Sequence, residues 1–223
     1  IVQIVGTNAA AGARLGLQNK NTGGSAYNEI LGTDAGGQST SSIRFYNTDQ
    51  SNNYGEIAFG TRNASGTPPV DRMRISKDGY VTKPNHPAFK CSIATQSSPN
   101  TGVVSENNGF TLNATSGRDA FNNGSHFSEA TGRFTAPVTG LYFFHFSVMR
   151  YSGNGSGSMD LRIKKNTALI WARSYKASYS TNYESINLTT ITNMTAGHFV
   201  EFILGANMSV YDDDSYMLGY LIG

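Results

Sequence analysis

Charged residues are scarce in this sequence: Asp, Glu, Lys and Arg make up 14% of its 223 residues, compared with about 25% in an average globular protein. The 17 basic and 15 acidic residues leave a net charge of +2. A chain so close to neutral has no electrostatic footprint for nucleic acid or for an anionic membrane surface. We therefore expect no nucleic-acid partner.

Cysteine and long apolar runs are also missing. The single Cys91 excludes a disulfide framework within the chain and, without a partner motif, is predicted to be a packing residue. No apolar run reaches the roughly 20 residues that span a bilayer, so we expect no membrane insertion. The sequence starts at Ile1 without a signal peptide, which indicates that it begins partway along a longer protein.

Residues typical of turns and strands are abundant in place of charged residues. The sequence contains 25 Gly, 12 Tyr and 12 Phe, together with many Ser, Thr and Asn. Gly, Asn and Ser favour turns, whereas aromatic and β-branched residues favour strands. No segment has a convincing helical pattern, so the composition predicts an all-β protein.

Residues 1–83 contain short alternating segments, three of which share a pattern of two apolar residues two apart, followed by polar ones: Leu15 to Asn21, Ile43 to Asp49 and Ile57 to Asn63. Each apolar strip is too small to offset the entropy of ordering a single chain. Three copies around a threefold axis would close a core. We predict an N-terminal trimeric β-rich fibre-shaft segment, and a small antiparallel sheet is the alternative.

The segment from Asp71 to Val81 predicts a strand, a tight turn at Asp78-Gly79 and a second strand. It resembles a hairpin that recurs near the ends of phage tail-fibre and neck-fibre shafts, just before a terminal domain. The prolines of Lys83-Pro84-Asn85-His86-Pro87 interrupt regular structure. We place the domain boundary there, with a shaft over residues 1–83 and a second domain over residues 84–223.

The second domain has longer and more apolar strands. Gly140 to Met149 is apolar in both phases, which predicts a central strand buried on both faces, with His145 as a core histidine. Further strands are predicted over residues 160–164, 168–174, 185–193, 199–204 and 216–222. Many short strands without helices are typical of a sandwich or jelly roll.

Residues 127–146 resemble the signature of the complement 1q globular domain. The matching positions are Phe127, Phe134, Gly140, Tyr142, Phe144 and Phe146, with Asn122 five residues before Phe127. The closing segment Ser215 to Ile222, with Gly219 followed by Tyr220, resembles the family's last strand. The resemblance implies a jelly-roll β-sandwich head that forms homotrimers through side chains around the axis.

No catalytic constellation is evident, because the four histidines lie in separate segments without metal-ligand spacing. We expect no enzymatic activity. Asp212, Asp213 and Asp214 are predicted to form a turn before the last strand and are a candidate calcium site, since Ca²⁺ takes six to eight oxygen ligands. A solvated acidic turn without an ion is the alternative, and calcium is the one cofactor considered.

Aromatic and polar residues gather in two predicted loops, and the candidate receptor-binding residues there are Tyr151, Asn154, Tyr175, Tyr179 and Tyr183. Tyr, Ser, Asn and Gly are typical of adaptable binding loops, because Tyr supplies contact area at a low entropic cost. The alternative is that these tyrosines cover strand edges or a subunit interface.

These patterns predict a virion fibre protein, the distal part of a phage tail fibre, that attaches to the bacterial surface through a trimeric head. The expected partners are two more copies of the chain, other fibre, baseplate or neck proteins, and a host glycan or outer-membrane protein. The expected location is the virion, outside the cell. The alternatives are a purely structural neck or capsid fibre and a secreted complement 1q-like recognition protein, although the sequence has no Gly-X-Y stalk.

Overall fold

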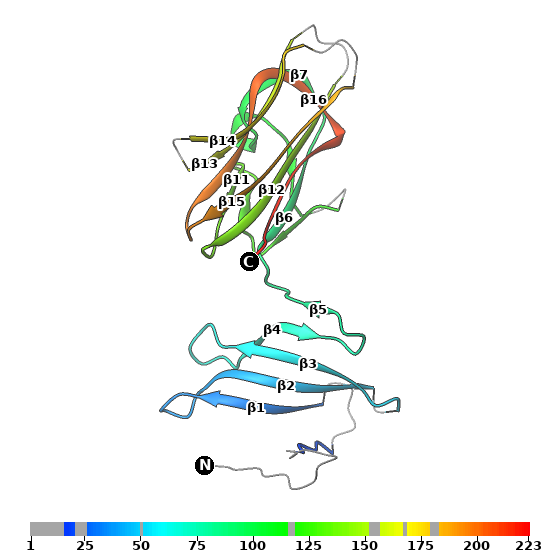
Figure 1. The fold of residues 1–223 in the computed structure, drawn as a ribbon, viewed down its shortest axis with the longest axis vertical. Helices are drawn as coiled ribbons and strands as arrows, with labels where there is room; N and C mark the ends of the chain where they lie inside the picture. Colours follow the sequence, from blue (N-terminus) through cyan, green and yellow to red (C-terminus); the bar gives the residue numbers. More distant parts are fainter. Residues whose placement is uncertain are drawn as a thin grey trace, which may run out of the picture. The chain divides into compact units, whose positions relative to one another are not determined.

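The computed structural model describes residues 16–20, 26–49, 51–115, 119–151, 157–166, 169–178 and 183–223, without the side chains of residues 169, 170 and 213. The chain divides into two compact units, Ile1–Pro84 and Asn85–Gly223, called here the sheet unit and the head unit (Figure 1). Among the described residues of both units, regular structure is strand, apart from one short 3₁₀ turn, η1 (Glu106–Asn108). The predicted all-β fold class is confirmed.

The sheet unit is an antiparallel meander in which each strand pairs with the next (Figure 1). Its strands are β1 (Tyr27–Thr33), β2 (Ser39–Asp49), β3 (Tyr54–Thr61), β4 (Val70–Ile75) and β5 (Val81–Thr82). The strands predicted around Ile43 and Ile57 are confirmed. The segment predicted around Leu17 is wrong, since residues 16–20 are not in a strand; Leu15 and Asn21 lie outside the described residues.

The hairpin predicted between Asp71 and Val81 is confirmed, but its connection is wider than a two-residue turn. β4 and β5 are joined by residues 76–80, where the Ser76 amide donates to the Tyr80 carbonyl at 2.9 Å. Gly79 has a φ of +83°, a conformation that residues with a Cβ rarely adopt. The glycine therefore lets the chain reverse before β5.

The head unit is a two-layered β-sandwich (Figure 1). Its strands are β6 (Ala88–Ile93), β7 (Gln96–Val103), β8 (Leu112–Asn113), β9 (Phe121–Asn123), β10 (Phe127–Ser128), β11 (Arg133–Thr135), β12 (Gly140–Arg150), β13 (Met159–Lys165), β14 (Leu169–Lys176), β15 (Ser185–Met194) and β16 (Phe199–Leu221). In the first layer, the start of β16 pairs with β13 on one side and with β11 and then β7 on the other. The second layer runs β15, β12, the end of β16, and β6.

Strand β16 belongs to both layers, which corrects the prediction of two separate strands with a turn at Asp212–Asp214. The structure has one 23-residue element, Phe199–Leu221. Its pairing with β12 is interrupted between Ser147 and Met149. Ser215 fills the gap by accepting a hydrogen bond from the Met149 amide at 2.9 Å. The hydroxyl satisfies the backbone where the register shifts, so the strand bends without a turn.

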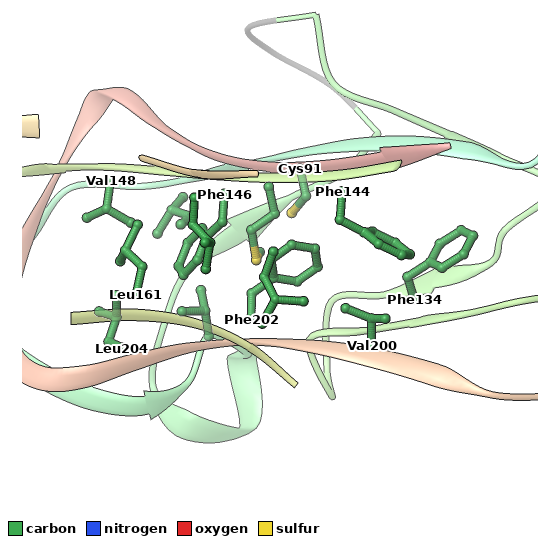
Figure 2. Packing of buried hydrophobic residues seen from close by; sticks show 14 of the residues in the cluster. Cys91, Phe134, Phe144, Phe146, Val148, Leu161, Val200, Phe202 and Leu204 are labelled. Atoms are coloured by element: carbon green, nitrogen blue, oxygen red, sulfur yellow. The ribbon is translucent and has the colours of Figure 1, made fainter. Parts of the chain in front are cut away.

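The core lies between the layers and is rich in aromatic side chains (Figure 2). β12 contributes Tyr142, Phe144 and Phe146, all at 0% exposure, and β16 contributes Phe202. Phe127 and Phe134 are also buried and flank Phe89, with ring centroids at 4.4 and 5.2 Å from it. Cys91 is at 0% exposure in the same cluster, which confirms its prediction as a packing residue.

Two residues that match the family pattern, Asn122 and Gly219, determine the local structure around them. The Asn122 side chain donates to the Phe127 carbonyl at 2.8 Å and accepts from the Phe127 amide at 3.1 Å, which closes the turn between β9 and β10. Gly219 lies opposite Phe144 in the pairing of β12 with β16. A Cβ on Gly219 would overlap the Phe144 ring. The aromatic core therefore requires a glycine at this position.

The prediction that β12 is buried on both faces is wrong for a single chain. Phe143, His145 and Met149 are only partly buried, whereas Phe144 and Phe146 on the opposite face are fully buried. Only one face of the second layer packs on the first layer. His145 is thus not a core histidine but lies on the outer face of the sandwich.

Candidate functional site: the outer face and the tyrosine end of the head unit

The outer face of the second layer carries apolar side chains aligned across four strands. One row consists of Ile191, Phe143, Tyr220 and Ala88. The rings of Phe143 and Tyr220 stack with centroids 5.1 Å apart, and both Ile191 and Tyr220 are exposed. Exposed apolar patches of this kind mark interaction surfaces.

The neighbouring row adds a histidine to this face. His145 Nδ1 lies 2.8 Å from Thr189 Oγ1, and its ring lies 5.5 Å from that of Tyr216. Burial lowers the pKa of His145 below its ordinary value, so the imidazole is neutral at neutral pH. A neutral ring adds no charge to the apolar face.

Three tyrosines meet in the head unit, on segments far apart in the sequence: Tyr151 just after β12, Tyr183 just before β15, and Tyr211 within β16. We call them the tyrosine cluster. Their ring centroids are 5.1 to 6.3 Å apart. The sequence predicted Tyr151 and Tyr183 as site residues, and the structure brings these two together.

Backbone contacts hold the tyrosine cluster in place. The Tyr151 amide donates to the Ser209 carbonyl at 3.2 Å, and the Arg150 amide donates to the Glu184 carbonyl at 2.8 Å. Tyr183 has a φ of +60°, a region that residues other than glycine seldom occupy and that is enriched at functional sites. These bonds tie the backbone of Tyr151 to β16 and the end of β12 to the residue after Tyr183.

Beside the cluster is a cavity of about 280 Å³ lined by hydroxyl and amide side chains, namely Thr95, Gln96, Ser97, Ser98 and Thr111, and by Gly109. We call it the hydroxyl cavity. The Asp212 amide donates to Thr95 Oγ1 at 3.2 Å, and Gln96 pairs with Val210. Two residues that line the cavity therefore contact the residues on either side of Tyr211 in β16.

Among the other predicted site residues, Tyr175 does not join this group. Tyr175 is an exposed residue of β14 with the Arg173 guanidinium 4.9 Å from its ring centroid. Asn154 and Tyr179 lie outside the described residues.

Arg173 is itself held by Asp160, a buried carboxylate of β13. Arg173 donates to both Asp160 oxygens at 2.8 and 2.9 Å, and Arg162 donates to Oδ2 at 2.6 Å. Burial acts to raise the pKa of Asp160, but the hydrogen bonds from Arg173 and Arg162 outweigh it and the pKa is lowered. Both oxygens of this ionised carboxylate accept hydrogen bonds from arginine side chains.

The acidic run does not form the predicted turn. Asp212 and Asp214 lie within β16, and the side chain of Asp213 is outside the description. No group of three or more His, Cys, Asp or Glu among the described residues is placed to hold a metal ion. Calcium binding by Asp212–Asp214 stays a prediction.

The sequence profile of the C1q domain matches residues 103–222, more than half of the chain. The chain belongs to the C1q domain family. This confirms the jelly-roll head predicted from the aromatic signature. The C1q domain is a recognition domain, typically trimeric, rather than an enzyme.

Among solved structures, the globular domain of zebrafish complement 1qA protein matches with 20% identity over 61% of this chain and 98% of that chain, at a TM-score of 0.41. So low a score adds no argument to the profile match. The comparison with curated proteins gave no match. Within the described residues, no helix is long and apolar enough to cross a membrane.

Sequence reasoning missed Tyr211 and the hydroxyl cavity of the C1q head. The sequence pattern gave no role to Tyr211, which directly precedes the turn predicted at Asp212–Asp214. The residues of the cavity are common polar ones, and only the pairing of β7 with β16 brings them next to a tyrosine. An aromatic residue directly before the acidic run was the available signal.

Proposed function

We propose that this chain is part of a phage fibre protein whose C1q head attaches, as a homotrimer, to carbohydrate on the bacterial surface. The tyrosine cluster beside the hydroxyl cavity is the observation that carries the recognition part of this proposal. We also propose that the chain is located on the virion and is joined there to other fibre proteins or to the particle.

The outer face of the second layer supports the trimer. Phe143, Tyr220 and Ile191 form an apolar row that a single chain leaves in contact with water. Burying such a row between copies gains roughly 25 cal/mol per Å² of apolar surface. A C1q domain that trimerises through this face would cover both the row and the neutral His145.

The tyrosine cluster supports carbohydrate as the ligand. Sugar rings present CH faces that stack on aromatic rings and hydroxyls that need hydrogen-bonding partners. The three tyrosines offer the first kind of contact and the hydroxyl cavity offers the second. A single open site of this size is weak, near a dissociation constant of about 1 mM or about −4 kcal/mol, so that attachment depends on the three sites acting together.

The hairpin of β4 and β5 supports the fibre setting, because its sequence resembles the end of phage fibre shafts. A secreted recognition protein of a cell is the second candidate, since C1q membership fits it equally well. Mass spectrometry of purified phage particles separates the two. Peptides of this chain in washed particles are expected for a fibre, and their confinement to cell secretions is the result expected for the alternative.

The attachment test uses the full chain with Tyr151→Ser, Tyr183→Ser and Tyr211→Ser, each measured by adsorption of the purified trimer to host cells. We expect each change to reduce adsorption by about tenfold or more, since avidity multiplies the loss at three sites. Tyr80→Ser is the matched control, because Tyr80 is 72% exposed in the turn of the sheet unit.

Unchanged adsorption in all three cluster variants would exclude this surface as the binding site. If intact trimer adsorbs to no host preparation, a purely structural fibre becomes the better explanation. Competition by free surface polysaccharide, but not by outer-membrane protein, is the result that identifies carbohydrate as the ligand.

A further inference from the structure

The two faces of the sheet unit have opposite chemistry. Strand pairing places one set of side chains on a common face, called here the apolar face: Ile30, Ile43, Phe45, Ile57, Phe59, Met73, Ile75 and Val81. None of these is fully buried. A sheet of this kind normally packs one face against another layer.

Charged side chains of the opposite face pair with one another within the chain. Arg44 bonds Glu29 and Asp71 at 2.8 and 3.1 Å, and Arg74 bonds Glu56 and Asp71, both at 2.8 Å. These arginines also lie over tyrosine rings of the same face. Burial acts to raise the pKa of Asp71, but its hydrogen bonds from Arg74 and Tyr46 help to lower it, so this carboxylate stays ionised. The charged face therefore has the composition of a surface that faces water.

The apolar face is large enough for an interface. Five strands spaced about 4.8 Å apart give a width near 20 Å. An exposed apolar area of a few hundred Å² on a soluble chain marks an interaction site. A hollow of about 470 Å³ at one edge of this face, lined by Leu17, Ile30 and Phe45 among others, provides room for side chains of a partner.

We propose that the apolar face packs against the same face of two further copies of this chain, so that three sheet units enclose one shared core. The covalent link between the two units indicates which partner covers the apolar face. Asn85 of the head unit directly follows Pro84 of the sheet unit, so a trimeric head tethers three copies of the sheet unit. A short tether of this kind gives an effective concentration in the millimolar range.

The chemistry of the face fits identical copies. Its side chains are aliphatic and aromatic and need no complementary charge from a partner. Arg72, at the rim, donates to Thr61 Oγ1 of its own chain at 3.3 Å. Threefold repetition would bury the row of Phe45, Ile57 and Ile75 and leave the arginine network outside.

The inference rests on the trimeric state proposed for the C1q head, and the experiment separates the two. The full chain is made with Ile57→Cys, on the apolar face, or with Leu31→Cys, on the charged face. Leu31 is a matched control because its exposure in one chain is 46% against 37% for Ile57. The native Cys91 contributes little background, since burial raises the pKa of its thiol to about 12.

Each variant is treated with a maleimide under native conditions, its labelling rate is followed by mass spectrometry, and its mass is measured by light scattering before treatment. We expect the Ile57→Cys thiol to be labelled about tenfold more slowly than the Leu31→Cys thiol, because the shared core covers it and reactive thiols must be accessible. A second apolar-face variant, Met73→Cys, should behave like Ile57→Cys and shows that the result does not depend on one substitution.

Two outcomes overturn the inference in different ways. A trimer by light scattering whose Ile57→Cys and Met73→Cys thiols are labelled as fast as the Leu31→Cys thiol leaves the head trimer intact and overturns the packing of the sheets. A monomer by light scattering overturns the trimeric head and the shared sheet core together.

Discussion

The sheet unit and the head unit are built from the same kinds of residue but solve the burial problem differently. The head unit encloses an aromatic core between two layers, with Phe144 and Phe202 at 0% exposure. Among the described residues of the sheet unit, no large apolar side chain is fully buried. A single layer has no second layer to cover its apolar face, so its stability must come from outside the chain.

The largest difference should appear when the units are separated. We expect residues 85–223 alone to melt cooperatively and residues 1–84 alone, at micromolar concentration, to show no cooperative transition. The reason is that ordering costs about 1–2 kcal/mol per residue and the sheet unit lacks a core to offset it. Circular dichroism against temperature measures both. A cooperative transition of monomeric residues 1–84 would contradict the expectation that the sheet unit does not fold alone.

Removing one buried and one exposed aromatic side chain from the head unit gives the next largest effect. Phe144→Ala should destabilise the head by about 3–5 kcal/mol, the usual cost of deleting a fully buried Phe. Phe121→Ala, at a side chain of the same type that is exposed in the same unit, should cost under about 1 kcal/mol. Denaturant titration followed by fluorescence measures both, and equal losses would show that the core is misplaced.

Adding a methyl group tests the same core by overfilling it instead of leaving a cavity. Gly219→Ala should destabilise the head by about 1–3 kcal/mol, because the new Cβ overlaps the Phe144 ring and forces the core to shift. Gly37→Ser is a useful contrast in the sheet unit. Gly37 has open space around it but a φ of +75°, so that its cost should be only the backbone strain of about 1 kcal/mol. Thermal melts of the full chain resolve the two.

The smallest effect concerns two carboxylates that are each held by two arginines, Asp160 in the head and Asp71 in the sheet. Asp160→Asn should cost about 2 kcal/mol and Asp71→Asn about 0.5 kcal/mol, because a pair is worth more when it is better buried. The side chain of Asp160 is 3% exposed and that of Asp71 is 17% exposed.

The pH dependence of these two carboxylates follows from the direction of their shifts. Both pKa values are lowered in the folded chain. The stabilisation is therefore fully present above the unfolded value of about 3.9 and is lost as the pH falls through the folded value. Denaturant titrations at pH 7 and pH 3 should show a smaller penalty for Asp160→Asn at pH 3. An equal penalty at both values would contradict this assignment.

Much of the fold could be predicted from local sequence patterns. The alternation from Gly140 to Met149 gave β12, and the Gly79 turn gave the β4–β5 hairpin, because side-chain period and φ preference are properties of neighbouring residues. The aromatic signature around Phe127, Tyr142 and Phe144 gave the family. Each of these features depends on residues that lie close together in the sequence.

Other features were decided only by the tertiary structure. The sequence alone determined that the chain is a β protein with a C1q head, and it named Tyr151 and Tyr183. It did not show that β16 bends through both layers, that Tyr211 joins those tyrosines, or that Asp160 is buried between Arg162 and Arg173. Each of these depends on strand pairing between segments tens of residues apart. Pairing partners of that kind are selected by the burial of whole faces, which no local pattern encodes.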